Sequence, residues 1–170
     1  MEFSIRPVRE QDAESIIELL NPIIQAGKYT VMDEPFTVDD QIDFIRGFPK
    51  CGVYHAAVCN DSQKVVGIQD VAPLSESSVF KHVGEISTFV ALGSHRHGIG
   101  ARLCQATFQV AQAKGFLKLN ATVRADNPQA IAFYQGQGFK VIGTAHQHAF
   151  IQGKYIDEIL LEKLNLAKVI

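Results

Sequence analysis

The chain has 170 residues, of which 46% are hydrophobic and 20% are charged, and its formal net charge is −2. This composition is ordinary for a globular protein, and the length suits a single domain with a substantial core. The slight negative charge argues against bulk attraction to nucleic acid or to an anionic membrane, although a local basic patch can still hold a phosphate-bearing ligand.

We expect a cytoplasmic protein with free thiols. The N-terminal segment lacks the apolar core of a signal peptide, and no apolar run approaches the roughly 18–20 residues of a spanning helix. The three cysteines, Cys51, Cys59 and Cys104, form no CxxC pair and leave an odd count. A disulfide framework is therefore not expected, and a reducing compartment is the simplest setting.

The chain opens with a predicted strand and helix. Residues 3–8 alternate between apolar and polar as a strand does, and Asp12 is a candidate N-cap for the helix that follows. We expect Asn21-Pro22 to interrupt this helix, because proline lacks the N–H that a helix interior uses. The apolar face of the helix is formed by Ile16, Ile17, Leu20, Ile23 and Ile24.

A second helix and a strand pair are predicted next. The helix is expected over residues 38–46, with Thr37 as its N-cap. Strands are expected over residues 53–59 and 65–72, joined by a short polar turn at 60–62. Such closely spaced strands favour antiparallel pairing.

The next predicted elements are a strand over residues 82–90, a helix from about Gly98, and a strand over residues 117–123. Apolar residues in the helix recur at spacings of 4, 3, 4 and 3, which predicts one buried stripe. That stripe consists of Ile99, Leu103, Ala106, Val110 and Ala113.

Asn127-Pro128 opens a short helix, because Asn caps well and Pro fits the first turn, and Gly138 closes it. Residues 139–145 and 155–164 are predicted as two final strands. The element order indicates a mixed α+β sheet in one domain spanning residues 1–170, rather than a regular βαβαβ repeat.

A basic, glycine-rich turn lies between the strand at 82–90 and the helix after it. It is written His95-Arg96-His97-Gly98-Ile99-Gly100. Glycines let the backbone approach a ligand closely, and the free N–H groups of a helix N-terminus favour a phosphate or pyrophosphate. A dinucleotide-binding fold would need a third glycine and this motif after the first strand, which the sequence does not supply.

The turn resembles motif A of the GNAT superfamily of acetyl-CoA-dependent N-acetyltransferases, Q/R-x-x-G-x-G/A, with His95 at the first position. Residues 127–139 resemble the family's motif B, N-x-x-A-x-x-x-Y-x-x-x-G-F. The two motifs stand in the family's order, with a helix and a strand between them. The resemblance implies a GNAT fold, which has a central, mostly antiparallel twisted sheet of about seven strands, flanking helices and a splayed parallel strand pair.

Two further segments resemble one group within this family. Glu85-Ile86-Ser87-Thr88-Phe89-Val90 is similar to the E-x-S-x-Y-V strand of the phosphinothricin and methionine sulfoximine acetyltransferases. Lys154-Tyr155-Ile156-Asp157 is similar to the K-x-x-D of their last strand. Residues 73–82 lack that group's arginine-rich stretch, and Tyr134 replaces the histidine that many members carry. The resemblance implies an amino acid or an amino-acid analogue as the acceptor.

The resemblance also implies the site residues. As catalytic residues it implies Glu85, which would bind the amine or accept its proton, and Tyr134, which would donate a proton to the departing CoA sulfur. A backbone N–H at Phe89 or Val90 would bind the thioester oxygen. The implied acetyl-CoA-binding residues are Phe89, Val90, His95, Arg96, His97, Gly98, Ile99, Gly100, Ala101, Asn127 and Tyr134. The implied substrate-binding residues are Tyr29, Phe36, Glu85 and Ser87.

No metal is expected, because His146 and His148 have no third ligand at a recognisable spacing, although they are predicted to share a strand face. The expected reaction is direct attack by a primary amine of a small molecule on acetyl-CoA in a ternary complex. Relatives often dimerise, so the resemblance implies a homodimer. Three alternatives stay open: peptide or protein acetylation, a CoA-binding domain without transfer activity, and a nucleotide-binding enzyme.

Overall fold

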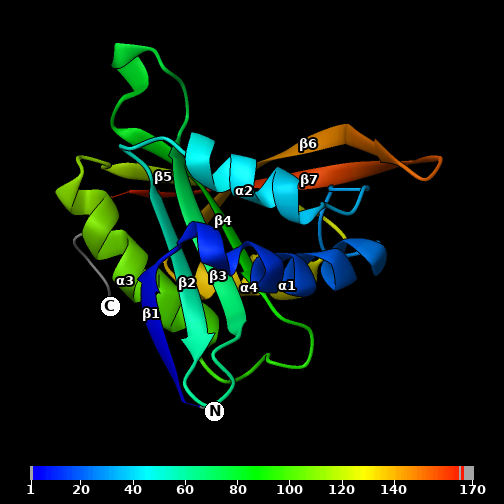
Figure 1. Ribbon diagram of the computed structural model, residues 1–170. Coiled ribbons are helices and arrows are strands. Elements are labelled where there is room, and N and C mark those ends of the chain that lie inside the picture. Colours follow the sequence, from blue (N-terminus) through cyan, green and yellow to red (C-terminus); the bar gives the residue numbers. More distant parts are fainter. Residues whose placement is uncertain (1, 165, 167–170) are drawn as a thin grey trace.

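The computed structural model describes residues 2–164 and 166. In this part of the chain, seven strands form one sheet in the order β1-β2-β3-β4-β5-β7-β6 (Figure 1). The strands are β1 (Phe3–Pro7), β2 (Val53–Cys59), β3 (Val65–Pro73), β4 (Val83–Val90), β5 (Lys118–Arg124), β6 (Lys140–Ile151) and β7 (Lys154–Leu164). The helices are α1 (Ala13–Gln25), α2 (Val38–Gly47), α3 (Ile99–Ala113) and α4 (Pro128–Gly136), with short 3-10 turns at η1 (Glu10–Asp12) and η2 (Ser78–Phe80). None of these helices is long and apolar enough to cross a membrane.

The helices cover the two faces of the sheet (Figure 1). Ile68 of β3 belongs to the apolar cluster of α1, whereas an added Cβ on the preceding Gly67 would lie 2.6 Å from Ile99 of α3. Because neighbouring residues of a strand point to opposite faces, α1 and α3 pack on opposite sides of β3. Helix α2 lies on the α1 side, where Phe44 packs edge-on against Tyr54 of β2 with ring centroids 5.8 Å apart.

The predicted fold class is confirmed, including the splayed parallel pair. Among the described strands, β4 and β5 form the one parallel pair, and their register ends at Glu85 opposite Asn120. The antiparallel β3–β4 ladder continues to Val90 opposite Gly67. Beyond Glu85, therefore, β4 keeps its partner on one side only, and a wedge opens between it and β5.

The predicted interruption at Asn21-Pro22 is wrong, because Pro22 lies inside α1. An interior proline costs a helix about 3 kcal/mol. The next turn nevertheless stays helical: Ile23 and Ile24 are each 3% exposed, and the Ala26 N–H donates to the Pro22 carbonyl oxygen at 3.1 Å. We attribute the continuation to the burial of these two side chains in the core.

Asp12 precedes α1 as predicted, but its carboxylate does not cap the helix. It accepts hydrogen bonds from both Arg6 Nη atoms, each at 2.7 Å, and from the Arg9 N–H at 2.8 Å. Thr37 does cap α2 as predicted, because its Oγ1 accepts from the Asp40 N–H at 3.2 Å.

The predicted stripe of α3 is right in its first turns and wrong beyond them. Ala106 and Val110 are only half-buried, and Ala113 is exposed. An α-helix turns every 3.6 residues, so a stripe at alternating spacings of 4 and 3 drifts by about 20° every seven residues. The buried face consists of Ile99, Leu103, Cys104, Thr107, Phe108 and Ala111.

Candidate functional site

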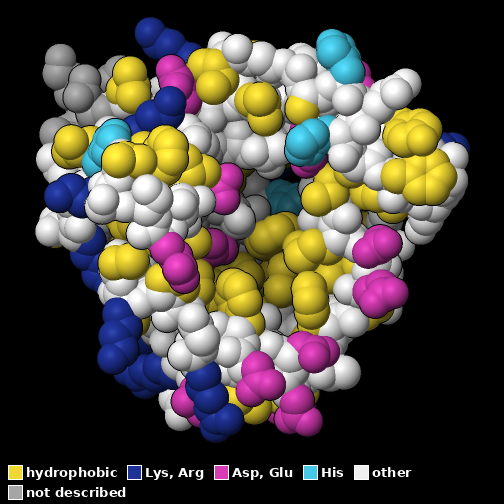
Figure 2. All heavy atoms as spheres, turned by 90° about the horizontal axis from the view of Figure 1, so that it is seen from above, with side chains coloured by type: hydrophobic (Ala, Val, Ile, Leu, Met, Phe, Trp, Pro, Cys, Tyr) yellow, Lys and Arg dark blue, Asp and Glu magenta, His cyan; other side chains and the backbone are white. Residues whose placement is uncertain are grey.

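Two cavities meet at the wedge where β4 leaves β5. A cavity of about 940 Å³ lies on the α1–α2 side of the sheet, and a cavity of about 800 Å³ lies between the end of β4, the start of α3 and α4. Figure 2 shows a deep hollow with a largely apolar floor, and acidic and histidine side chains lie around it. Both cavities are lined by Tyr29, Thr88, Phe89 and Ala130. The two cavities therefore adjoin at these four residues.

The glycine-rich turn lines the smaller cavity, together with most of the predicted acetyl-CoA-binding residues. His97 is exposed and does not line this cavity, and Tyr134 lines the larger cavity instead. The predicted residues that line the smaller cavity are Phe89, Val90, His95, Arg96, Gly98, Ile99, Gly100, Ala101 and Asn127.

The backbone of this turn is shaped to hold an anion. Arg96 and Gly98 both adopt left-handed backbone conformations, with φ of +66° and +74°. This conformation is costly for arginine, and such strain is often found where a loop has a function. The first hydrogen bond from within α3 runs from the Arg102 N–H to the Gly98 carbonyl oxygen at 3.0 Å. The preceding N–H groups of α3 have no acceptor in their own helix, so they can bind a phosphate.

The orientation of the β4 main chain distinguishes between Phe89 and Val90, the two residues predicted to offer an N–H to the thioester oxygen. The Ala91 N–H donates to the Val66 carbonyl oxygen at 3.0 Å, so the main chain of Ala91 turns toward β3. Main-chain groups alternate along an antiparallel strand, so Phe89 also turns toward β3, while Val90 turns toward the wedge. Val90 is therefore the residue whose N–H is oriented toward a ligand between β4 and β5.

Tyr134 is buried and belongs to a polar network in the core. Its hydroxyl donates to Thr88 Oγ1 at 3.0 Å, and Gln69 Nε2 donates to the same oxygen at 2.9 Å. Burial raises the pKa of Tyr134, so its phenol stays protonated at neutral pH. Because a hydroxyl accepts two hydrogen bonds and donates one, the Thr88 hydroxyl can still donate one hydrogen bond to a third partner.

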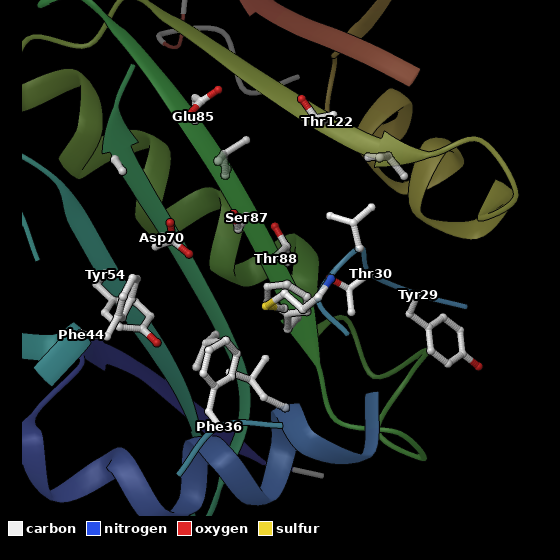
Figure 3. A pocket seen from close by; sticks show the side chains of 18 of the residues that line it. Tyr29, Thr30, Phe36, Phe44, Tyr54, Asp70, Glu85, Ser87, Thr88 and Thr122 are labelled. Carbon is white, nitrogen blue, oxygen red and sulfur yellow. The ribbon is translucent and has the colours of Figure 1, made fainter. Parts of the chain in front are cut away.

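The predicted substrate-binding residues all line the larger cavity, which Figure 3 shows from close by. Tyr29 and Phe36 come from the segment between α1 and α2. Glu85 and Ser87 come from the same face of β4, and Glu85 is exposed where β4 and β5 part. The structure thus brings these residues together in one cavity, while their roles stay predictions.

Asp70 of β3 also lines the larger cavity, and our interpretation of the sequence missed it. It lies between Tyr54 of β2 and Ser87 of β4, directly opposite both in the sheet register (Figure 3). The side chain is half-buried, and burial raises its pKa to about 7, opposed by a hydrogen bond from its own backbone N–H. One signal was available: a strand with apolar residues on both faces carries the polar pair Gln69-Asp70 at its centre.

Negative charge dominates the larger cavity. Arg124 is the only lysine or arginine among the described residues that line it. Its guanidinium donates to both carboxylate oxygens of Asp126, at 2.8 and 2.7 Å, and to the carbonyl oxygens of Gly27 and Thr30, each at 3.0 Å. The carboxylates that line the cavity are Glu34, Asp40, Asp70, Glu85 and Glu158.

His146 and His148 of β6 do not share a strand face, in contrast to the prediction. Gln147 between them adopts a φ of +51°, and the β6–β7 register shifts between Ala145 and Ala149, so regular alternation fails there. His146 Nδ1 lies 2.9 Å from Asp157 Oδ2. Within residues 2–164 and 166, no cluster of three or more His, Cys, Asp or Glu side chains is arranged to hold a metal ion.

Comparison with known proteins places these features in a family context. The model of the acetyltransferase (GNAT) domain family matches residues 5–160. A phosphinothricin N-acetyltransferase of Streptomyces coelicolor is 25% identical over 164 residues, which are 95% of this chain and 96% of that protein.

Two solved structures share the fold. One is a GNAT superfamily phosphinothricin acetyltransferase from Sinorhizobium meliloti in complex with acetyl-CoA, with a TM-score of 0.88, 19% identity and coverage of 97% of this chain and 89% of that one. The other is a ribosomal-protein-alanine N-acetyltransferase from Brucella melitensis, with a TM-score of 0.87, 22% identity and coverage of 95% and 99%. At this identity the likeness establishes the fold.

Proposed function

Since the chain belongs to the GNAT family of acetyltransferases and uses acetyl-CoA, we propose that it acetylates a primary amine of a small molecule by direct attack in a ternary complex. The observation that carries this proposal is the meeting of the two cavities at Thr88 and Phe89. One cavity suits the cofactor and the other an acceptor. Holding both reactants in contact removes much of the entropic barrier, so no covalent acetyl-enzyme is needed.

The smaller cavity fits acetyl-CoA. The free N–H groups at the start of α3 and the Arg96 side chain would hold the pyrophosphate. Gly100 leaves room for the ring of Phe133, because an added Cβ would lie 2.8 Å from it. The Val90 N–H would bind the thioester oxygen and stabilise the charge that develops there.

The residues at the meeting point have distinct tasks in this proposal. Acetyl-CoA supplies the activated acetyl group. Glu85 accepts the proton that the acceptor ammonium must lose, either directly or through a water molecule. Tyr134, whose hydroxyl donates to Thr88 Oγ1, would turn this O–H to the departing sulfur and transfer its proton there. The likeness to a phosphinothricin N-acetyltransferase supports a small molecule with a primary amine as the acceptor.

A pair of charge variants tests the cofactor site. Ala101 and Gln105 are both exposed on α3, but only Ala101 lines the smaller cavity. Ala101→Glu places a carboxylate beside the proposed pyrophosphate site and should weaken CoA binding at least about tenfold, because like charges repel strongly at a shared site. Gln105→Glu introduces the same side chain one turn later and should leave the Kd unchanged. Equal CoA affinity in both variants, measured by calorimetry, would place the cofactor elsewhere.

Tyr134→Phe tests the proton donor. Removal of this hydroxyl should lower kcat by about 10²–10⁴-fold, the usual contribution of a general acid, with little change in the KM for acetyl-CoA. The assay is CoA release with any amine that supports turnover. An unchanged kcat would mean that the sulfur is protonated by another group.

We also propose a cytoplasmic homodimer. Acetyl-CoA is an intracellular metabolite, which supports the location. The β6–β7 ribbon exposes apolar side chains, and the rings of Phe150 and Tyr155, 62% and 63% exposed, pack on each other with centroids 4.9 Å apart. Light scattering on the purified protein should give twice the monomer mass of 18.7 kDa. Phe150→Ser should shift that mass toward the monomer, because large exposed apolar patches mark interfaces.

A further inference from the structure

Asp70 is a carboxylate that the proposed reaction does not yet use. It lies inside the larger cavity. Burial raises its pKa, and a hydrogen bond from its own backbone N–H opposes that rise. Among the described residues, no lysine, arginine or histidine forms an ion pair with it. A half-buried carboxylate is costly unless a positive charge or hydrogen-bond donors approach it. The cavity therefore holds a carboxylate that a bound cation would stabilise.

The position of Asp70 suits the ammonium of the acceptor. Asp70 and Ser87 face each other across β3 and β4 as a hydrogen-bonded pair, in which Cα atoms lie about 5.5 Å apart. Thr88, which lines both cavities, is the next residue of β4. Glu85 lies diagonally from Asp70, about 7–8 Å away between Cα atoms, at the closed end of the wedge, where β4 and β5 part. Asp70 is thus closer than Glu85 to the place where the two cavities meet.

The charges around Asp70 would repel an acidic acceptor. Glu34, Asp40 and Glu158 line the same cavity, and the one arginine there is held by Asp126 and two carbonyl oxygens. On the face that Figure 2 shows, lysine and arginine side chains lie away from the hollow. An amino acid carries a carboxylate within a few ångströms of its amine. The carboxylates of the cavity would repel this group, so the cavity should discriminate strongly against an amino acid.

The walls of the cavity suit an apolar body. Phe36, Phe44 and Tyr54 lie on the side of Asp70 that faces α1 and α2 (Figure 3). Aromatic faces also attract an ammonium group through their electron-rich π systems. Building on the function proposed above, we infer that Asp70 binds the ammonium of the acceptor, and that the acceptor is an apolar or arylalkyl primary amine without an anionic group.

Three compounds with one skeleton test this inference. Phenethylamine carries no anionic group, L-phenylalaninamide presents the amine as a peptide N-terminus does, and L-phenylalanine adds a carboxylate. We expect kcat/KM for phenethylamine or the amide to exceed that for L-phenylalanine by at least about tenfold, because a like charge beside Asp70 penalises the acid. Equal or faster acetylation of L-phenylalanine, or of phosphinothricin, would overturn the inference while leaving the proposed function intact.

Variants of Asp70 separate a binding role from a structural one. Asp70→Asn should raise the KM for phenethylamine at least about tenfold and shrink the preference over L-phenylalanine, because the repelling charge is removed with the attracting one. Glu85→Gln should instead lower kcat. Asp33→Asn is the matched control, because Asp33 is exposed and does not line the cavity. An unchanged preference in Asp70→Asn would overturn the inference.

A binding measurement tests the inference without turnover. Calorimetry on the protein saturated with CoA should give a lower Kd for phenethylamine than for L-phenylalanine, and Asp70→Asn should narrow the difference. Equal values would overturn the inference. If CoA itself does not bind, the proposed function fails. Phenethylamine and L-phenylalanine can then be titrated into the protein alone, where a lower Kd for phenethylamine that depends on Asp70 would support the inference and equal values would overturn it.

Discussion

Asp70 should make the unliganded protein less stable as the pH rises. Its pKa is raised by burial to about 7 from an ordinary value of 3.8, so the folded chain disfavours the charged form. The stability that the neutral form contributes is fully present below pH 3.8 and is lost as the pH rises through about 7. Each pKa unit corresponds to about 1.36 kcal/mol, so the penalty above pH 7 is about 4 kcal/mol.

Asp70→Asn removes this penalty, because the amide has nearly the same shape and does not ionise. We expect the variant to gain about 4 kcal/mol of unfolding free energy relative to wild type between pH 4 and pH 8.5. Urea denaturation of both proteins at a series of pH values measures this, because the difference between them cancels all other titrating groups. A stability difference between Asp70→Asn and wild type that does not change with pH would refute the reasoning.

Two further substitutions probe the cofactor side of the site. Gly100→Ala places a methyl group 2.8 Å from the Phe133 ring and should raise the KM for acetyl-CoA, whereas Gly136→Ala, with no atom within 4 Å of the added Cβ, should leave it unchanged in the CoA-release assay. Asn127→Ala removes the cap on the Ala130 N–H, a 3.2 Å hydrogen bond, and should lower the unfolding free energy in urea by about 1 kcal/mol. A Gly100→Ala enzyme with a normal KM, or an Asn127→Ala protein of full stability, would contradict these assignments.

Elements with strong local signals were predictable from the sequence. Strand β2 spans Val53–Cys59 as predicted, because an apolar run there ends at a polar turn. Helix α2 begins at Val38 because Thr37 caps it through its own side chain. The motifs around Gly98 and Tyr134 were likewise visible in the sequence, and the two residues line adjoining cavities, while their roles stay predictions. Each of these features depends on residues that are close in sequence.

Features that depend on pairing between distant strands were not predictable. Whether Phe89 or Val90 turns its N–H to the wedge is decided by the phase of the β3–β4 ladder, which is fixed by the contact of Ala91 with Val66. Periodicity places Asp70 on one face of its strand, but only the strand order shows that this face opens into the same cavity as Ser87. The helical path through Pro22 likewise depends on burial against the sheet.

The same physical property makes Asp70 costly to the fold and useful to the site. A carboxylate at this depth destabilises the unliganded protein, since nothing in the described chain neutralises it. An ammonium ion bound beside it would offset that cost, because it stabilises the charged carboxylate. This stabilisation contributes to the affinity for a cation. An acceptor with its own carboxylate would cancel this gain, because its negative charge would face the one already present. Stability and selectivity at this position are therefore coupled: Asp70→Asn should stabilise the unliganded protein at alkaline pH and should also weaken its discrimination between an amine and an amino acid.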